Sequence, residues 1–388
     1  TVKLKKQESY PVIDIDKITP GYKAVRSVAS IEYTGQGGAK FQDHDVLFAR
    51  ITPCLENGKM AIADTEGQNG IGSTELFVFR GIDGVSDTDY VYYLLCMKHI
   101  RQLAANSMTG ASGRQRADLD FIKRIQWDFP DIEMQKKIAS VLSAYDNLIE
   151  VNNKRIKVLE QIAENLYKEW FVRFRFPGHE TAEFENGIPE GWAYRRADEV
   201  IDFNPTLKAG NQTEFTIIPM EALSTNSMVL DSGCFVRQDS ISGRRSQNGD
   251  TLLAKITPCL ENGKTGFVMG MPENEALGGS TEFVVMRSKA LTPHYVYCIA
   301  RSYYFRQTAI LSMNGADGRQ RVDEDKLKST KILQPEKTVL DHFETIVTPI
   351  FDGVYQMVQE NKNLIQQRDL LLPRLMSGKL EVQYALND

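Results

Sequence analysis

Hydrophobic and polar positions along the chain form the same succession of segments twice. Residues 40–80 and 250–287 are rich in Val, Ile, Phe and Thr and are punctuated by Gly, Asn and Pro, which predicts short strands joined by tight turns. Residues 88–106 and 293–312 carry apolar and aromatic residues at helical spacing. Each group is followed by a long stretch with a seven-residue apolar period. We therefore expect two mixed α+β globules, each followed by a long helix.

The two long stretches, residues 131–171 and 336–376, have the apolar pattern of a coiled coil. Steps between apolar positions alternate between three and four, as in the seam where two helices meet. In the first stretch the two series are Leu142, Ile149, Ile156, Ala163, Trp170 and Ile138, Tyr145, Asn152, Leu159, Leu166. In the second they are Phe343, Ile350, Met357, Leu364, Leu371 and Leu340, Val347, Val354, Asn361, Arg368, Leu375. About 40 residues predict a rod roughly 60 Å long.

Each seam contains one asparagine, Asn152 at position d and Asn361 at position a. Position a faces position d only when two helices run antiparallel, so the two amides share a layer only in that orientation. We therefore expect an intramolecular antiparallel coiled coil in which this polar layer selects the register. The same register places Trp170 against Phe343. The alternative is two amphipathic helices, each packed on its own globule.

Three sequence motifs occur in both halves. Residues 49–59 (ARITPCLENGK) and 254–264 (AKITPCLENGK) share ten of eleven positions at an offset of 205. The other two pairs are RQLAANSMTGASGRQR at 101–116 with RQTAILSMNGADGRQR at 306–321, and GSTELFVFR at 72–80 with GSTEFVVMR at 279–287. Two homologous halves in tandem follow from these repeats.

The halves differ at their starts. Ten residues precede Pro11, whereas residues 191–215 precede the equivalent position of the second half. Either the opening strand of the first half is short, or another part of the chain supplies that piece; the pattern leaves both open.

The length of 388 residues exceeds one ordinary core and predicts several domains. Hydrophobic residues at 42%, charged residues at 25% and the lack of an apolar run near 20 residues indicate a cytoplasmic protein without a membrane span or signal peptide. The expected parts are a first domain at 1–130, a first spacer helix at 131–171, a linker at 172–190, a second domain at 191–335, a second spacer helix at 336–376 and a tail at 377–388.

Five cysteines, at 54, 96, 234, 259 and 298, form no CxxC pair and lie near no histidine cluster. Neither a disulfide framework nor a zinc site is therefore expected, and no metal site is predicted. Cys54 and Cys259, inside the repeated motif, fit small core residues better than nucleophiles.

The net charge of -5 at first argues against a nucleic-acid partner, because affinity for DNA comes from Lys and Arg that neutralise phosphates. The net charge is, however, distributed unevenly along the chain. Residues 1–130 carry 16 basic and 16 acidic side chains, and residues 191–335 carry 17 and 16. The acidic excess belongs to residues 131–190 and 336–388, with 8 against 11 and 5 against 8. The two globules are balanced in charge and concentrate arginine in particular loops, so the net charge does not exclude DNA.

The order of motifs along the whole chain resembles the DNA-specificity subunit of type I restriction-modification systems. The resemblance includes the repeated motifs, FPDIEMQKKIASVLSAYDNLIEVNN at the first long helix, ENLYKEWFVRFRFPG followed by GIPEGW, and the closing LLPRLMSGKL. The short start of the first half departs from that pattern.

The resemblance implies two target-recognition domains, each reading one half of a split, asymmetric double-stranded DNA site, with the two helices setting the distance between the halves. It also implies partners: two modification (methyltransferase) subunits that use S-adenosylmethionine, and restriction subunits that add ATP- and Mg-dependent translocation and cleavage. The spacer helices would dock the modification subunits. No cofactor is implied for this chain.

Catalytic signatures in the chain are incomplete. Residues 261–265 end like a phosphate-binding loop, but Pro258 stands where that loop needs glycine. Residues 202–205 only loosely imitate a methyltransferase amine motif. The carboxylates of residues 130–136 imitate a nuclease site, yet they lie where a helix N-terminus favours acids. We expect no intrinsic catalysis.

Candidate DNA contacts are the cations and amides on repeated turns. Gly113 and Gly318 each precede an Arg-Gln-Arg sequence, whose arginines are expected to clamp phosphates; the alternative is ion pairing with Asp118 and Asp323. The residues of this group are Arg114, Gln115, Arg116, Arg319, Gln320 and Arg321. The two glutamines either read adenine edges or cap a turn.

A second group comes from the other repeated motifs: Arg50, Asn57, Lys59, Ser73, Thr74, Lys255, Asn262, Lys264, Ser280 and Thr281. The lysines at the turn exits are expected to contact phosphate, or else Asn-Gly makes a hairpin turn and the lysine is solvated. The Ser-Thr pairs either donate to phosphates or begin a strand.

Features that both halves share cannot make them read different bases, so base readers are expected where the copies diverge. These places are residues 35–40 and residues 240–248. In the second, Arg244, Arg245 and Gln247 are the candidate readers. A solvated flexible loop is the alternative.

Overall fold

The computed structural model describes residues 2–111, 113–208, 210, 212–273, 275–316 and 318–381, and divides into two compact units. Unit 1 comprises residues 1–151 and 361–388, and unit 2 comprises residues 152–360. Each unit contains one part of two long helices, α4 (Ile132–Tyr167) and α9 (Lys337–Met376). Residues 382–388 of the expected C-terminal tail lie outside the described residues.

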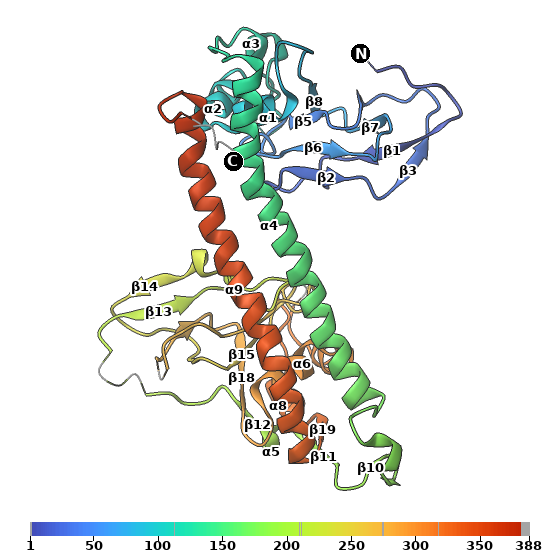
Figure 1. Ribbon diagram of the computed structural model, residues 1–388. Helices are drawn as coiled ribbons and strands as arrows, with labels where there is room; N and C mark the ends of the chain where they lie inside the picture. Colours follow the sequence, from blue (N-terminus) through green and yellow to red (C-terminus); the bar gives the residue numbers. More distant parts are fainter. Residues whose placement is uncertain are drawn as a thin grey trace, which may run out of the picture. The chain divides into compact units, whose positions relative to one another are not determined.

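Unit 1 has two four-stranded sheets and a group of helices (Figure 1). The first sheet has the order β3 (Ser30–Glu32), β1 (Ser9–Ile13), β7 (Gly70–Gly72), β4 (Ala39–Phe41), and the second β2 (Ala24–Arg26), β6 (Met60–Asp64), β5 (Val46–Ala49), β8 (Leu76–Phe79). The helices are α1 (Thr88–Cys96), α2 (Lys98–Asn106) and α3 (Leu119–Lys123).

Unit 2 repeats this plan, with additions at its start (Figure 1). Its sheets are β14 (Val236–Gln238), β13 (Phe215–Ile218), β17 (Gly278–Gly279), and β12 (Ile201–Phe203), β18 (Phe283–Ser288), β15 (Thr251–Ala254), β16 (Thr265–Phe267). Two ribbons join β11 (Ala193–Arg196) to β19 (Lys331–Gln334) and β9 (Phe184–Glu185) to β10 (Ile188–Pro189). Its short helices are α5 (Ala197–Val200), α6 (Pro293–Arg301), α7 (Tyr303–Leu311), α8 (Glu324–Ser329), and the single turns Lys168–Val172, His179–Thr181, Met220–Ala222 and Ser232–Cys234.

The two units differ at one edge of a sheet. In unit 2, β12 pairs with β18 and so covers its outer edge. In unit 1, β8 is the corresponding strand and lies at the edge of its sheet. Among the described residues, therefore, the first half lacks the strand that the longer start of the second half provides.

The strand that leads into the repeated ITPCLENGK motif is buried on both faces in each unit. In β5, Val46 and Phe48 enter one apolar cluster, whereas Leu47 and Ala49 enter another. Successive side chains of a strand point to opposite faces, so this strand has a core on each side. The strand β15 is arranged in the same way, with every residue buried. The motif that follows therefore starts from a fixed base.

A buried ion pair joins this strand to its neighbour in both units. The guanidinium of Arg80 donates to both oxygens of Asp45 at 2.6 Å, and that of Arg287 donates to both oxygens of Asp250 at 2.8 and 2.7 Å. Both aspartates are 1% exposed. Removal of either arginine would leave a buried carboxylate without its cation.

The two segments with helical spacing are each broken into two helices. The break between α1 and α2 is Met97, and the break between α6 and α7 is Ser302; both have extended backbone angles. The Ser302 hydroxyl accepts a hydrogen bond from the Phe305 backbone N–H at 3.3 Å, which starts the second helix.

The long helices contact each other within each unit. In unit 2, the rings of Trp170 and Phe343 lie 5.9 Å apart, as the antiparallel register predicts, and Asn152 Nδ2 donates to Glu360 at 2.9 Å. In unit 1, Asp146 of α4 forms an ion pair with Arg368 of α9. Asn152 and Asn361 are both buried but belong to different units, so their shared layer stays a prediction.

None of the helices in the described part of the chain has the length and apolar content that crossing a membrane requires.

Phe343 tests the helix contact in unit 2, because it is fully buried against Phe171 and Trp170. The change Phe343→Ala should destabilise this unit by about 3–5 kcal/mol, since a large side chain is lost and a cavity remains. The control Val158→Ala, at a 57% exposed position of α4, should cost less than about 0.5 kcal/mol. Urea unfolding followed by circular dichroism measures both; equal midpoints for the two variants would contradict this packing.

Candidate nucleic-acid interface

In each unit the structure brings the Gly-Arg-Gln-Arg segment against the Ile-Thr-Pro turn. In unit 1, the Thr52 backbone N–H donates to the Gln115 carbonyl at 3.0 Å, and the Gln115 N–H donates to the Thr52 hydroxyl at 3.1 Å. In unit 2, Thr257 and Gln320 make the same two contacts, both at 3.1 Å. Two motifs about 60 residues apart therefore form one backbone frame, in which the glutamines bind the turn through their main chain.

The second arginine of the segment pairs with the glutamate of the third repeated motif. Arg116 Nη2 and Nε donate to Glu75 at 2.6 and 2.9 Å, and Arg321 Nη2 and Nε donate to Glu282 at 2.7 and 2.9 Å. These bonds lower the pKa of both carboxyl groups. Both arginines therefore form ion pairs, with other acids than Asp118 and Asp323, and each stays partly exposed; their contact with phosphate stays a prediction.

Asp118 and Asp323, the acids expected to pair with arginine, have another role. Each accepts hydrogen bonds from two backbone N–H groups at the start of a helix, Asp118 from α3 and Asp323 from α8. They are N-cap residues, and one carboxylate oxygen of each, Oδ1, accepts both bonds.

The first arginine of each segment, Arg114 and Arg319, is exposed. It follows Gly113 or Gly318, whose backbone φ angles of 81° and 79° lie in the left-handed region that favours glycine. The backbone therefore turns sharply before a long cationic side chain that projects into solvent, a geometry suited to phosphate contact.

In the turn ITPCLENGK the asparagine side chain is exposed, whereas the lysine side chain binds a backbone carbonyl of its own unit. Asn57 and Asn262 are exposed. Lys59 Nζ donates to the Ile15 carbonyl at 2.9 Å, and Lys264 Nζ donates to the Met220 carbonyl at 3.2 Å. Each lysine fixes a distant backbone segment of its own unit, which neither alternative from the sequence foresaw.

The Ser-Thr pairs begin a strand. The hydroxyl of Ser73 accepts from the Glu75 N–H at 3.1 Å, and that of Ser280 accepts from the Glu282 N–H at 3.2 Å. Thr74 and Thr281 are exposed beside them. The serines thereby position the two glutamates that hold Arg116 and Arg321.

Arg50 of unit 1 lies between the Phe77 ring and Glu75. Its guanidinium carbon is 5.2 Å from the ring centroid, and its Nε is 3.6 Å from a Glu75 oxygen. A stack of this kind keeps the side chain extended beside Arg116.

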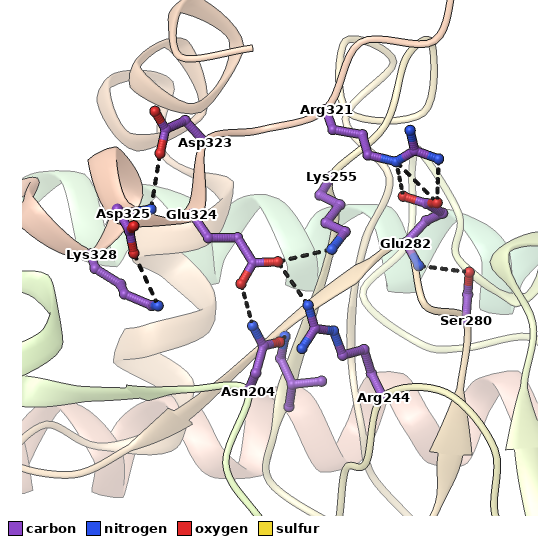
Figure 2. Close-up of polar contacts among 11 residues, drawn as sticks. Asn204, Arg244, Lys255, Ser280, Glu282, Arg321, Asp323, Glu324, Asp325 and Lys328 are labelled. Carbon is purple, nitrogen blue, oxygen red and sulfur yellow. Dashed lines mark hydrogen bonds and ion pairs between the residues drawn. The ribbon is translucent and has the colours of Figure 1, made fainter. Parts of the chain in front are cut away.

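Unit 2 contains a further cluster around Glu324, at the first turn of α8 (Figure 2). One carboxylate oxygen accepts from Arg244 Nη2 and from Lys255 Nζ, both at 2.8 Å, and the other accepts from Asn204 Nδ2 at 2.8 Å. The exposed fractions of the side chains are 32% for Arg244, 24% for Glu324 and 13% for Lys255. Two cations share one anion here, so the cluster has a net charge of about +1.

The segment 240–248 is held by backbone bonds and is not a free loop. The Arg244 N–H donates to the Gly279 carbonyl at 3.0 Å, and the Ser246 N–H donates to the Leu277 carbonyl at 2.9 Å. The alternative of a solvated flexible loop is therefore wrong. Arg245 donates to the Leu207 carbonyl, and the Gln247 N–H donates to Asp250 at 2.8 Å.

The matching segment of unit 1, residues 35–40, ends in β4. Gly38 approaches the Gly72 carbonyl as Gly243 approaches that of Gly279, so the two segments are equivalent at the offset of 205. Lys40, the equivalent of Arg245, donates to the Tyr33 hydroxyl at 2.6 Å. Ala39 stands where unit 2 has Arg244.

Sequence reasoning missed the anions of the interface: Glu75, Glu282 and Glu324, together with Asn204. The first two lie in the repeated GSTE sequence, which was a usable signal. Glu324 had no such signal, because its equivalent in the first half is Leu119. Asn204 was noted only within an incomplete methyltransferase motif.

The sequences that imitate catalytic motifs have structural roles. Asp131 accepts from the Met134 N–H at 2.8 Å and so caps α4, while Lys264 and Asn204 make the contacts given above. Within the described ranges, no group of three or more His, Cys, Asp or Glu side chains could hold a metal ion.

The cysteines are free thiols, and two of them are strongly shielded. Burial raises the pKa of Cys96 to about 12 and also raises the pKa of Cys298. A thiol that resists deprotonation is a poor nucleophile. Cys54 packs beside the apolar cluster of β5 and β6, as expected of a small core residue.

Comparisons with known proteins agree with this geometry. Residues 1–161 match the family model described as the type I restriction modification DNA specificity domain. The chain is 25% identical over 319 residues to the type I restriction enzyme MjaIX specificity subunit of Methanocaldococcus jannaschii, covering 79% of this chain and 72% of that protein. It is 23% identical to the MjaVIII specificity subunit of the same organism, covering 96% and 89%.

The crystal structure of the type I restriction-modification system S subunit from M. genitalium has the same fold, with a TM-score of 0.54 and 14% identity over 96% of this chain and 92% of that chain. At 14% identity, this likeness concerns the fold alone. Over most of its length the chain is similar to DNA-specificity subunits of type I restriction-modification systems, and its residues 1–161 match the domain model of that family.

Proposed function

We propose that the chain reads a bipartite, asymmetric DNA site, with one target-recognition domain for each half-site, and that it has no catalytic activity of its own. The observation that supports this most strongly is the repeated frame of the interface. In both units a Gly-Arg-Gln-Arg segment, an Ile-Thr-Pro turn and a Ser-Thr-Glu strand start come together and present arginine to solvent. Two similar frames with different neighbouring segments suit two half-sites of different sequence.

The long helices are proposed to form an intramolecular antiparallel coiled coil that acts as the spacer. The contacts of Trp170 with Phe343 and of Asp146 with Arg368 support this arrangement. Helices of 36 and 40 residues are about 54 and 60 Å long. Such a rod would fix the distance between half-sites, as a dimer axis does in other DNA-binding proteins.

Docking of modification subunits is proposed along α4. Four of its large apolar side chains are exposed: Leu148 by 38%, Val151 by 41%, Val158 by 57% and Ile162 by 46%. Their spacing of three, seven and four residues places them on one helical face. A helix that already buries its seam yet keeps a second apolar face offers a surface for a partner helix. Restriction subunits, with the ATP- and Mg-dependent steps, would join this assembly.

The arginine segments and the divergent segment should differ in what they contribute to DNA binding. Replacing Arg319 and Arg321 by Ala should weaken binding to every sequence and reduce the slope of log K against log salt by about 2, because two phosphate contacts are lost. Arg244→Ala should relax sequence choice in one half-site only. Binding of selected and random duplexes at several salt concentrations measures both effects.

Arg196→Ala is the matched control, because this arginine is 52% exposed, pairs with Asp198 and lies outside the repeated motifs. It should leave both the affinity and the salt slope nearly unchanged. The same loss on selected and random DNA from all three changes would refute the division between phosphate and base contacts.

The apolar face of α4 can be tested without DNA. The double change Val158→Asp and Ile162→Asp should weaken association with the modification subunit at least tenfold, about 1.4 kcal/mol, because charges would enter an apolar contact. Gln161→Asp, on the adjoining face of the same helix, is the control. Co-purification after co-expression is the measurement, and retention of the partner by the double variant would exclude this face.

A further inference from the structure

The cluster around Glu324 distinguishes unit 2 from unit 1. At the equivalent positions unit 1 has Leu119 for Glu324 and Ala39 for Arg244, so the acid and the arginine are present together in one half and absent together from the other. The neighbouring cation occurs in both halves, as Arg50 and Lys255. The divergence therefore concerns one ion pair within a shared frame.

The geometry fixes the carboxylate before any ligand arrives. Asn204 Oδ1 accepts from the Val285 N–H at 3.0 Å, which orients its amide so that Nδ2 donates to Glu324. The Asn204 N–H also donates to the Val285 carbonyl at 2.7 Å. The strand β18 thus orients Asn204, and Asn204 holds one Glu324 oxygen. The other Glu324 oxygen accepts from the two cations.

Backbone hydrogen bonds hold Lys255 in the same frame. Its N–H donates to the Glu282 carbonyl at 2.9 Å, and its carbonyl accepts from the Val322 N–H at 2.9 Å. Only 13% of its side chain is exposed, so its charge needs a close anion. Figure 2 shows the Glu282–Arg321 pair beside the Glu324 cluster.

Arg244 keeps donors for a ligand. Its hydrogen bond to Glu324 uses one N–H of Nη2, whereas a guanidinium has five N–H groups. In the part of the chain that the structure describes, Glu324 is the one partner recorded for this guanidinium, and about a third of the side chain is exposed. Paired N–H groups on one edge of arginine match the O6 and N7 acceptors of guanine in the major groove.

We propose that Glu324 is a positioning residue that orients Arg244 to read a guanine in the half-site of unit 2. This inference rests on the proposed function. Glu324 fixes the plane of the guanidinium and cancels one of the two charges, which reduces attraction to phosphate and leaves the directional contact with the base. Unit 1 lacks both residues and therefore reads its half-site by other contacts.

The test compares the full chain with Arg244→Ala, Glu324→Gln, Glu324→Asp and Asp325→Asn. Asp325 is the matched control, because it lies next to Glu324, loses the same charge on substitution and pairs with Lys328 at 3.4 Å, with its side chain 93% exposed. Each protein selects sites from a randomised double-stranded DNA library. Affinities are then measured for the selected duplex and for duplexes altered at single positions.

Wild type should select a guanine that Arg244→Ala no longer selects. Glu324→Gln should reduce the preference for that same guanine at least fivefold and leave the other half-site unchanged, and Glu324→Asp should restore part of the preference. Binding of random DNA should change by the same small factor in Glu324→Gln and Asp325→Asn. Loss of fold would instead weaken all positions of that half-site together.

Two results would overturn the inference and leave the proposed function intact. One is a Glu324→Gln protein that binds more tightly with its guanine preference unchanged, which would make Glu324 a shield for the cations. The other is an Arg244→Ala protein that selects the wild-type sequence while Arg319→Ala with Arg321→Ala still weakens binding. A wild-type chain that selects no sequence would refute the proposed function and the inference together.

Discussion

Arg116, Arg321 and Arg244 are each held by a carboxylate from a distant segment of the same unit. Glu75 and Glu282 hold the second arginine of the repeated segments through paired N–H groups, and Glu324 holds Arg244. A planar guanidinium bound in this way loses most of its rotational freedom before DNA arrives, so less entropy is lost on binding. The cost is net charge, because each oriented cation is accompanied by an anion. The even balance of basic and acidic residues in the two globules is compatible with this pairing and does not argue against DNA.

The backbone below these side chains is equally constrained. The strands β5 and β15 are covered by apolar clusters on both faces, and the repeated turn leaves directly from their ends. Hydrogen bonds from Thr52 and Thr257 then attach the Gly-Arg-Gln-Arg segment to the turn. A turn anchored on a doubly buried strand cannot shift without breaking core packing. The frame is therefore rigid, and variation between the halves is confined to segments attached to its edge.

The sequence predicted the elements and motifs well, since apolar periodicity and internal repetition are local properties. The strands, the long helices and the contact of Trp170 with Phe343 all follow from it. It did not predict which acid pairs with Arg116. Asp118 is the nearer acid along the chain, but it caps α3, and the strand register brings Glu75 to the arginine instead. Lys59 was misjudged for the same reason, because its acceptor, the Ile15 carbonyl, lies in a segment brought close only by folding.

The divergence between halves has a physical logic that the repeats alone did not reveal. Arg244 without Glu324 would leave two neighbouring cations, which attract any phosphate, whereas Glu324 without Arg244 would pair with Lys255 alone and leave no net charge. Two unit charges 4 Å apart near a protein surface interact with an energy of about 4 kcal/mol. An unpaired charge at this place would therefore change the attraction between the protein and a phosphate substantially. Unit 1 lacks both members of the pair and has Ala39 and Leu119 in their places. A shared frame that fixes phosphate contacts, combined with a side-chain pair that changes as one, allows a half-site to acquire a new base preference without loss of the fold.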